Sequence, residues 1–254
     1  MKIRRLNTDN SWQIEWNGVN FLLDPWLSGP EIDGFRAFNI QWHREPPLPY
    51  ADLGHFSYVF VSQPYSDHCH RETLERLTGP FSLFGVKPAW KRIRRWLPER
   101  GELTIPDYTE QGATAEALQV CKMSPDRWID PIYHALIISR DDEYIFYSPH
   151  GFKLSDKQSE YLKNKKCRLL ITTSIRFDLP FFLGGVINPG PENLNYLTDL
   201  LRPDFVVNSH DAQKRAEGLV MKLAKAEYGN WPPIGLKHAK AEDIRDYGYR
   251  ELSC

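Results

Sequence analysis

The chain has 254 residues, of which 41% are hydrophobic and 26% are charged, and its formal net charge is −1. One large α/β domain spanning residues 1–254 accommodates this ordinary globular composition. A charge so close to zero gives no electrostatic reason to expect binding to nucleic acid or to an anionic membrane surface. No apolar run approaches the roughly 20 residues of a membrane-spanning helix.

The amino terminus and the cysteines indicate in which cellular compartment the protein is expected. Residues 1–5 are basic but are followed by the polar residues 7–10, so no secretory signal is visible. The four cysteines are widely spaced and form no paired motif: Cys69, Cys121, Cys167 and Cys254. We therefore expect reduced thiols and a cytoplasmic location.

A hairpin is predicted near the amino terminus. Residues 12–16 alternate polar and apolar side chains, and residues 19–23 resume the apolar pattern after Asn17-Gly18. Asn-Gly between two such runs is a strong hairpin signal, because both residues tolerate positive φ. The second strand ends at Asp24, beside a turn. Residues 28–56 are rich in proline, glycine and aromatic residues without a period. We expect a long surface loop that either forms a lid or pocket wall or is disordered.

The most distinctive segment is a polar loop between a strand and a helix. Residues 59–61 form an apolar run, residues 67–70 read Asp-His-Cys-His, and residues 72–77 have helical periodicity. In α/β proteins such loops carry chemistry, because the sheet holds them rigidly while they stay accessible. Imidazole and carboxylate groups at this density indicate metal binding or acid–base work. Alternatively, Asp67 or Thr73 caps the helix and the histidines are incidental.

The remaining chain alternates strands and helices. Apolar runs predict strands at residues 81–85, 117–122, 133–139, 144–147, 168–172 and 205–208. Helical periodicity predicts helices at residues 88–97, 156–164, 192–201 and 212–226. The basic outer face of the first of these helices is either a site for an anionic ligand or a solvated surface. Residues 177–191 are expected to wall a pocket for an apolar partner or, alternatively, to cover an oligomer contact.

Three separate strands end in a histidine: His68, which follows Asp67, then His150, and finally His210. Strand ends at one edge of a sheet converge in space, so these residues favour a shared metal site over three independent structural histidines.

This arrangement resembles the metallo-β-lactamase superfamily over nearly the whole chain. The hairpin ending in Leu23-Asp24-Pro25-Trp26 is similar to that family's first strands. The signature His-x-His-x-Asp-His aligns with residues 63–68, which keep Asp67 and His68 but carry Gln63 and Tyr65 in place of the leading histidines. The resemblance implies a four-layer αβ/βα sandwich with its site along one rim. More narrowly, residues 63–74 resemble a little-characterised branch seen in photosynthetic organisms.

The resemblance also assigns the later histidines. His150 stands where the family has a bridging aspartate, His210 matches its last histidine, and no histidine falls near residues 121–127, where another is expected. The chain therefore lacks the three-histidine site of a dinuclear member. It keeps a set suited to one zinc, or to iron: Asp67, His68, His150 and His210. If all four bind, the tetrahedral site is closed, and chemistry requires a fifth ligand. A metal-free descendant with an Asp67–His68 ion pair is the alternative.

Other residues near the motif have open roles. The candidate catalytic side chains are Asp67, His70 and Tyr65. His70 is either a base or extra ligand, or a helix cap; Tyr65 either donates to a substrate oxyanion or only packs. Gln63 and Asp24 are expected to orient the ligands. The flanking histidines could lower the pKa of the Cys69 thiol.

Two functions follow. The first is a metal-dependent hydrolase acting on a small-molecule ester, lactone or phosphodiester. The second is a metal-free binding or regulatory protein on the same scaffold. Nucleic-acid processing also occurs in the superfamily, but the neutral charge argues against it here. The sequence leaves the oligomeric state open.

Overall fold

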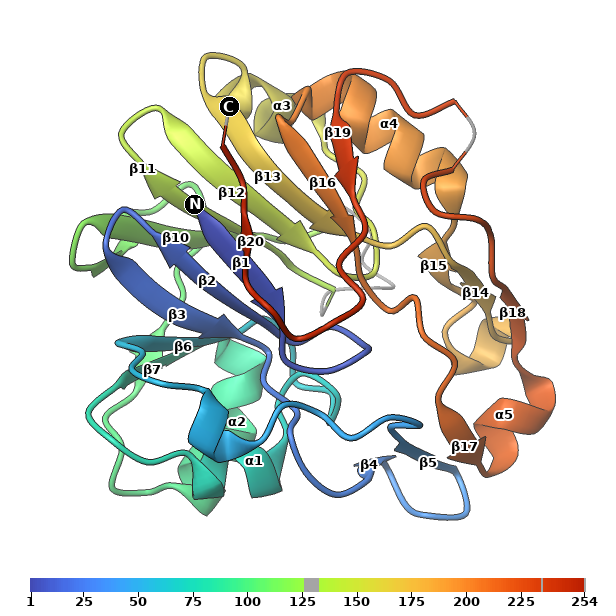
Figure 1. Ribbon diagram of the computed structural model, residues 1–254. Coiled ribbons are helices and arrows are strands. Elements are labelled where there is room, and N and C mark those ends of the chain that lie inside the picture. Colours follow the sequence, from blue (N-terminus) through green and yellow to red (C-terminus); the bar gives the residue numbers. More distant parts are fainter. Residues whose placement is uncertain (126–132, 234, 254) are drawn as a thin grey trace.

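The structure is a computed structural model that describes residues 1–125, 133–233 and 235–253. Two seven-stranded mixed sheets pack face to face (Figure 1). The first has the order β20 (Arg250–Glu251), β1 (Lys2–Arg5), β2 (Trp12–Trp16), β3 (Val19–Leu23), β6 (Tyr58–Val61), β7 (Ser82–Gly85) and β8 (Leu103–Thr104). The second has the order β19 (Lys240–Glu242), β16 (Phe205–Asn208), β13 (Lys166–Thr172), β12 (Glu143–Ser148), β11 (Ala135–Arg140), β10 (Leu118–Met123) and β9 (Ala113–Ala115).

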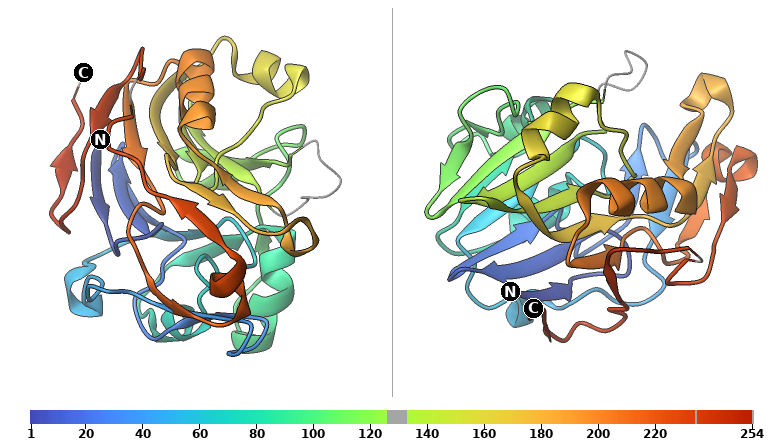
Figure 2. Two further views of the ribbon diagram at one scale, coloured as in Figure 1. Left: turned by 90° about the vertical axis from the view of Figure 1, so that its right-hand side faces the viewer. Right: turned by 90° about the horizontal axis from the view of Figure 1, so that it is seen from above.

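Helices cover the outer face of each sheet (Figures 1 and 2). Two lie against the first sheet, α1 (Arg71–Arg76) and α2 (Lys87–Trp96), and two lie against the second, α3 (Asp156–Leu162) and α4 (Pro191–Leu201). This order of helix, sheet, sheet and helix confirms the predicted αβ/βα sandwich. Among the described helices, none has the length and hydropathy to cross a membrane.

The strands of the second sheet are buried on both faces. In β11, Leu136 and Ile138 point into the core between the sheets, whereas Ile137 packs into an outer core with Leu194 and Leu197 of α4. Strands covered on both faces read as continuous apolar runs, which is why the sequence predicts this sheet well.

The amino-terminal hairpin forms as predicted. Trp16 of β2 lies opposite Val19 of β3, and Asn17 and Gly18 between them have φ values of 52° and 80°. The predicted strands from residue 59 to residue 208 and the predicted helices from residue 72 to residue 201 are present, with their ends shifted by one or two residues. β20 pairs with β1, so the two ends of the chain lie side by side (Figure 2).

Two predictions were wrong. Residues 28–56 are not one irregular loop, because they contain β4 (Glu31–Asp33), β5 (Asn39–Trp42) and the short 3-10 helix η1 (Tyr50–Asp52). Residues 212–226 are not one helix. They form β17 (Arg215–Glu217), α5 (Leu219–Leu223) and β18 (Lys225–Glu227).

The reason in both cases is pairing with distant segments. β17 pairs with β5, which pairs with β4. β18 pairs with β14 (Arg176–Asp178), which pairs with β15 (Val186–Pro189) across the 3-10 helix η2 (Phe181–Leu183). Strands of three residues have no resolvable period, and tertiary pairing decides them. These two small sheets lie together on the right in Figure 1.

Gly218 is the backbone pivot between β17 and α5. Its φ is 111°, and an added Cβ would lie 2.6 Å from the Phe38 carbonyl oxygen. We predict that Gly218→Ala lowers the free energy of unfolding by about 1–3 kcal/mol, because only glycine tolerates this conformation. Urea unfolding of the variant measures this. Gly229→Ala is the control, since a Cβ there meets nothing within 4 Å, and an equal effect of both substitutions would contradict the argument.

Candidate metal centre

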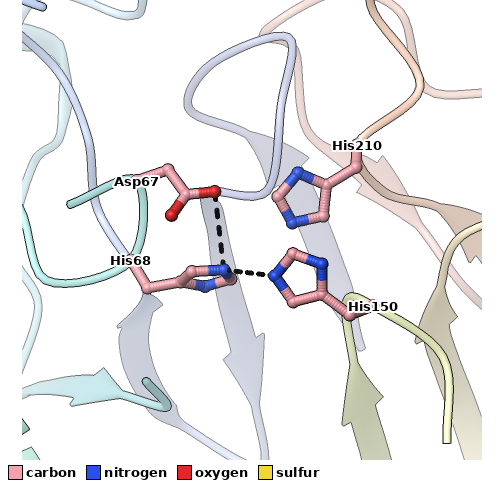
Figure 3. Close-up of side chains that lie close together, drawn as sticks. All are labelled: Asp67, His68, His150 and His210. Carbon is pink, nitrogen blue, oxygen red and sulfur yellow. Dashed lines mark hydrogen bonds and ion pairs between the residues drawn. The ribbon is translucent and has the colours of Figure 1, made fainter. Parts of the chain in front are cut away.

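Four predicted ligands come from three separate strand ends. Asp67 and His68 lie in the loop between β6 and α1. His150 follows β12, and His210 follows β16. β12 and β16 both run parallel to β13 between them, so their carboxyl ends meet at one edge of the sheet. Figure 3 shows the four side chains pointing toward one another.

The four side chains form one compact buried group. Each offers a ligand atom, and these atoms all lie within 4.8 Å of one another. Nε2 of His68 lies 2.8 Å from Nε2 of His150 and 3.6 Å from Oδ2 of Asp67. The rings of His150 and His210 stack with 4.4 Å between their centroids. The set comprises three imidazole nitrogens and one carboxylate oxygen, which are ligands that zinc and iron accept.

A buried oxygen holds the far nitrogen of each imidazole. The Nδ1–oxygen pairs are His68 with Asp24 (2.6 Å), His150 with Asn188 (2.8 Å) and His210 with Asp9 (2.8 Å). When Nδ1–H donates to an oxygen, the lone pair of a neutral ring is on Nε2. The Nε2 atom of His210 is buried and has no hydrogen-bond partner. The residues therefore fit a cation held among the three Nε2 atoms and Asp67.

The charges around the rings differ from one histidine to the next. Burial opposes protonation of His68, but the carboxylates of Asp67 and Asp24 outweigh it and raise the pKa of His68 to about 9. Burial lowers the pKa of His150 well below its ordinary value, and the neighbouring His210 and His68 lower it further. The centre thus concentrates anionic oxygen on the His68 side and keeps the ring of His150 neutral.

Asp24 connects three strands to the centre. Its carboxylate accepts hydrogen bonds from His68, from the backbone N–H and hydroxyl of Ser62 after β6, and from the hydroxyl of Tyr147 in β12 (2.8 Å). Its φ of 44° lies in the left-handed region, which non-glycine residues adopt chiefly where other contacts enforce it. Asp24 therefore orients His68, as the sequence predicted. Gln63 is buried, but its Oε1 has no hydrogen-bond partner, so it does not orient a ligand through that atom.

Asp9 was not anticipated from the sequence. Its carboxylate accepts from His210 and, at 3.0 Å, from the Nζ of Lys214. Burial disfavours the charged form of Asp9, but His210 and Lys214 more than offset this and hold its pKa well below the usual value. The only signal was the polar run at residues 7–10, directly after β1. No sequence pattern pointed to Asn188 or Lys214 as neighbours of the centre, because each lies in a segment where no strand was predicted.

Two of the predicted residues, His70 and Tyr65, lie near the centre without joining it. His70 caps α1 by accepting from the N–H of Thr73, and its Nε2 lies 3.3 Å from the Pro30 carbonyl oxygen. Both ring nitrogens therefore make structural contacts. His70 acts as the helix cap and is neither a base nor a member of the candidate metal site. Tyr65 lines the cavity beside Asp67 and stacks on Tyr133.

A cavity of about 220 Å³ opens beside the ligands. Asp67, His150 and His210 line it on one side. Apolar side chains from the two small sheets and their connections line it on the other: Phe38, Phe177, Leu179, Leu183, Ile187 and Val220. Residues 28–56 and 177–191 therefore both wall the cavity, as the sequence predicted.

Two further carboxylates border Asp67. Oxygen atoms of Glu31 and Asp33 lie within 4.8 Å of each other and of a carboxylate oxygen of Asp67. The Nζ of Lys214 lies 3.6 Å from Glu31, and burial raises the pKa of Glu31 well above its ordinary value against the opposing charge of Lys214. These residues belong to β4, a strand that the sequence pattern did not reveal. Together with Asp67 they place three carboxyl groups close together on the cavity wall.

The expectation for Cys69 was wrong. Its thiol is buried, and burial raises its pKa to about 12 instead of lowering it. Cys167 is buried in the same way, with a pKa raised to about 12. Both side chains pack in the hydrophobic cores, so neither is a reactive group at the centre.

We predict that iodoacetamide at pH 8 leaves Cys69 and Cys167 unmodified in the folded protein. With a pKa of about 12, about one thiol in ten thousand is ionised at that pH, and the buried position excludes the reagent. Peptide mass spectrometry after labelling native and urea-unfolded protein measures this. Rapid native labelling of Cys69 would contradict its burial.

The comparisons with known proteins identify the family. The fold and the buried Asp–His group define a protein of the metallo-β-lactamase type. A family model described as the beta-lactamase superfamily domain matches residues 6–173, and the chain belongs to this superfamily. A search of curated proteins finds no match.

Solved structures share the fold at low identity. An isothiocyanate hydrolase from Delia radicum gut bacteria is 17% identical, with a TM-score of 0.60 over 83% of this chain and 84% of that chain. Igni18, a metallo hydrolase from Ignicoccus hospitalis, is 15% identical, with a TM-score of 0.61 over 99% of both chains. A possible metal-dependent hydrolase from Veillonella parvula is 13% identical, with a TM-score of 0.62 over 83% and 85%. None of these supports the narrower resemblance to a branch in photosynthetic organisms.

Proposed function

We propose that the protein is a metal-dependent hydrolase with one metal ion bound by Asp67, His68, His150 and His210. The observation that carries this proposal is the convergence of three Nε2 atoms whose partner nitrogens are all held by buried oxygens. A purely structural histidine does not need its Nε2 atom to face the Nε2 atoms of two other histidines. Two of the similar structures are named metallo hydrolase or metal-dependent hydrolase, the class proposed here.

Zinc is the preferred ion, and iron is also compatible with three imidazole nitrogens and one carboxylate oxygen. When bound, such an ion supplies a Lewis acid that polarises the scissile group and lowers the pKa of water. Four protein ligands would close a tetrahedral site, so turnover requires a fifth position. The cavity beside Asp67, His150 and His210 offers the space on that side.

The residues of the chain supply the other parts of the reaction. The apolar cavity wall excludes water and strengthens the electrostatic interactions within. Tyr65, which lines the cavity beside Asp67, is the proposed hydrogen-bond donor to a substrate oxyanion. Substrates of matching chemistry are esters, lactones and phosphodiesters of small molecules.

A metal-free binding protein is the second candidate. A proton between the Nε2 atoms of His68 and His150, 2.8 Å apart, and the ion pair between Asp67 and His68 could stabilise the group without an ion. The cavity would then bind a small molecule without turnover. Metal content separates the two candidates.

We predict about one zinc or iron ion per chain by elemental analysis of protein purified without chelators or metal-affinity resin. His210→Ala is expected to lose the ion, because it removes one of three nitrogen donors. His55→Ala is the matched control, since His55 is exposed and precedes β6, at the end of that strand opposite to the loop with Asp67 and His68. Absence of metal from wild type even after reconstitution would overturn the hydrolase proposal and leave the binding protein. With metal present, esters, lactones and phosphodiesters are the substrates to screen.

Asp9→Asn tests the residues that support the ligands. The amide no longer holds the His210 Nδ1–H as a carboxylate does, so we predict a loss of about 10–100-fold in zinc affinity. Competition with a chromogenic chelator measures the affinity. Asp107→Asn is the control, because it also breaks a carboxylate–lysine pair, that of Asp107 with Lys122. Unchanged affinity in Asp9→Asn, with the fold intact by circular dichroism, would contradict the role of Asp9.

A further inference from the structure

Large apolar side chains are exposed around the cavity. Phe181 and Phe182 of η2 are 83% and 78% exposed, and Phe35 before β5 is 65% exposed. The other exposed apolar residues nearby are Val186, Leu219, Met221 and Leu223. We call residues 34–38, 181–187 and 219–226 the apolar collar. Exposed aromatic side chains at this density mark a surface that contacts an apolar partner.

The three segments of the collar are joined by backbone contacts. The N–H groups of Leu219 and Val220 donate to the carbonyl oxygens of Ala37 and Phe38, both at 3.0 Å. Asp178, at the base of the hairpin that carries η2, pairs with Lys225 on one side and with Val186 on the other. Figure 1 shows α5, β14, β15 and β18 together on one side of the molecule.

Each collar segment also contributes to the cavity wall. Phe38, Leu183 and Val220 line the cavity, whereas their neighbours Phe35, Phe182 and Leu219 are exposed. The exposed apolar surface is therefore continuous with the interior of the cavity.

The collar carries positive charge only. It contains Arg36, Lys222 and Lys225 and no acidic residue, although the whole chain has 33 acidic and 32 basic residues. The acidic residues next to the collar are engaged elsewhere. Asp33 lines the cavity, Asp178 pairs with Arg176 at 2.8 Å, and Glu217 pairs with Arg215 at 3.0 Å. Glu227, the last residue of β18, lies opposite Arg176 of β14.

We propose that the apolar collar docks the protein on the surface of an anionic lipid bilayer. Phenylalanine and leucine side chains enter the boundary between headgroups and acyl chains, and nearby lysine and arginine residues are attracted to anionic headgroups. Docking does not require the metal centre. It places the cavity against the lipid, so that an ester carrying an acyl chain can enter directly; this second step rests on the proposed function.

A second copy of the chain fits the collar less well. A symmetric dimer through this surface would place Arg36, Lys222 and Lys225 of one copy against the same residues of the other, because a two-fold interface is self-complementary. Like charges facing each other in a desolvated interface oppose association. An anionic lipid surface satisfies both the apolar and the cationic side chains.

Sedimentation with vesicles tests the proposal. Wild type is expected to sediment with vesicles of phosphatidylcholine and phosphatidylserine, less with phosphatidylcholine alone, and less at high salt. The double variant Phe181→Ser/Phe182→Ser should bind at least about tenfold more weakly. The double variant Lys222→Glu/Lys225→Glu should lose the preference for phosphatidylserine.

Matched controls separate the collar from general surface effects. Leu200→Ser removes an apolar side chain that is 43% exposed on α4, and Arg94→Glu/Arg95→Glu reverses two exposed charges on α2. Both should bind vesicles as wild type does. His210→Ala should also bind as wild type does, which distinguishes failure of docking from failure of the metal centre.

Two results would overturn the proposal. One is wild type that stays in the supernatant with both vesicle types, or that binds no better than the collar variants. The other is a dimer in gel filtration that Phe181→Ser/Phe182→Ser converts to a monomer without any vesicle binding, which would assign the collar to a second copy.

Discussion

Each of the three clustered imidazoles is fixed through Nδ1 by a buried oxygen, and the geometry of the centre depends on this constraint. Asp24, Asn188 and Asp9 come from the end of β3, from β15 and from the loop after β1. Without them the rings could rotate or exchange protons, and Nε2 would have no defined direction. With them, three Nε2 atoms face one space beside Asp67. The positions of the strand ends thus bring together a set of donor atoms that could hold a cation.

The same oxygens connect the centre to the two sheets. Asp24 receives hydrogen bonds from Ser62 after β6 and from Tyr147 of β12, so it bridges the first sheet to the second at the rim. Asp9 joins His210 to Lys214, and Lys214 lies beside Glu31 on the small sheet that walls the cavity. Packing between the sheets, orientation of the ligands and shape of the cavity are therefore coupled.

The departures from the superfamily signature have a consistent physical meaning. Gln63 and Tyr65, which the sequence resemblance aligns with the leading histidines, do not join the group of four side chains. His150, which it aligns with the bridging aspartate, does. An imidazole nitrogen serves one metal, whereas a carboxylate can bridge two, so the group that remains suits a single ion. The carboxyl groups of Glu31 and Asp33 lie beside Asp67, and the wall opposite is apolar and continues onto the exposed collar.

The sequence alone determined the elements that local pattern controls and the candidate ligands that directly follow them. Doubly buried strands read as apolar runs, Asn17-Gly18 encodes its own turn, and a histidine after such a strand reaches the sheet edge whatever the rest of the chain does. Tertiary structure alone decided the strands of three residues, β4, β17 and β18, because they exist only through pairing with distant partners. It also decided the roles of Asp9, Asn188 and Lys214, whose function is contact with residues up to 205 positions away, and the burial that raises the pKa of Cys69. Sequence spacing contains no information about such contacts until the sheets have assembled.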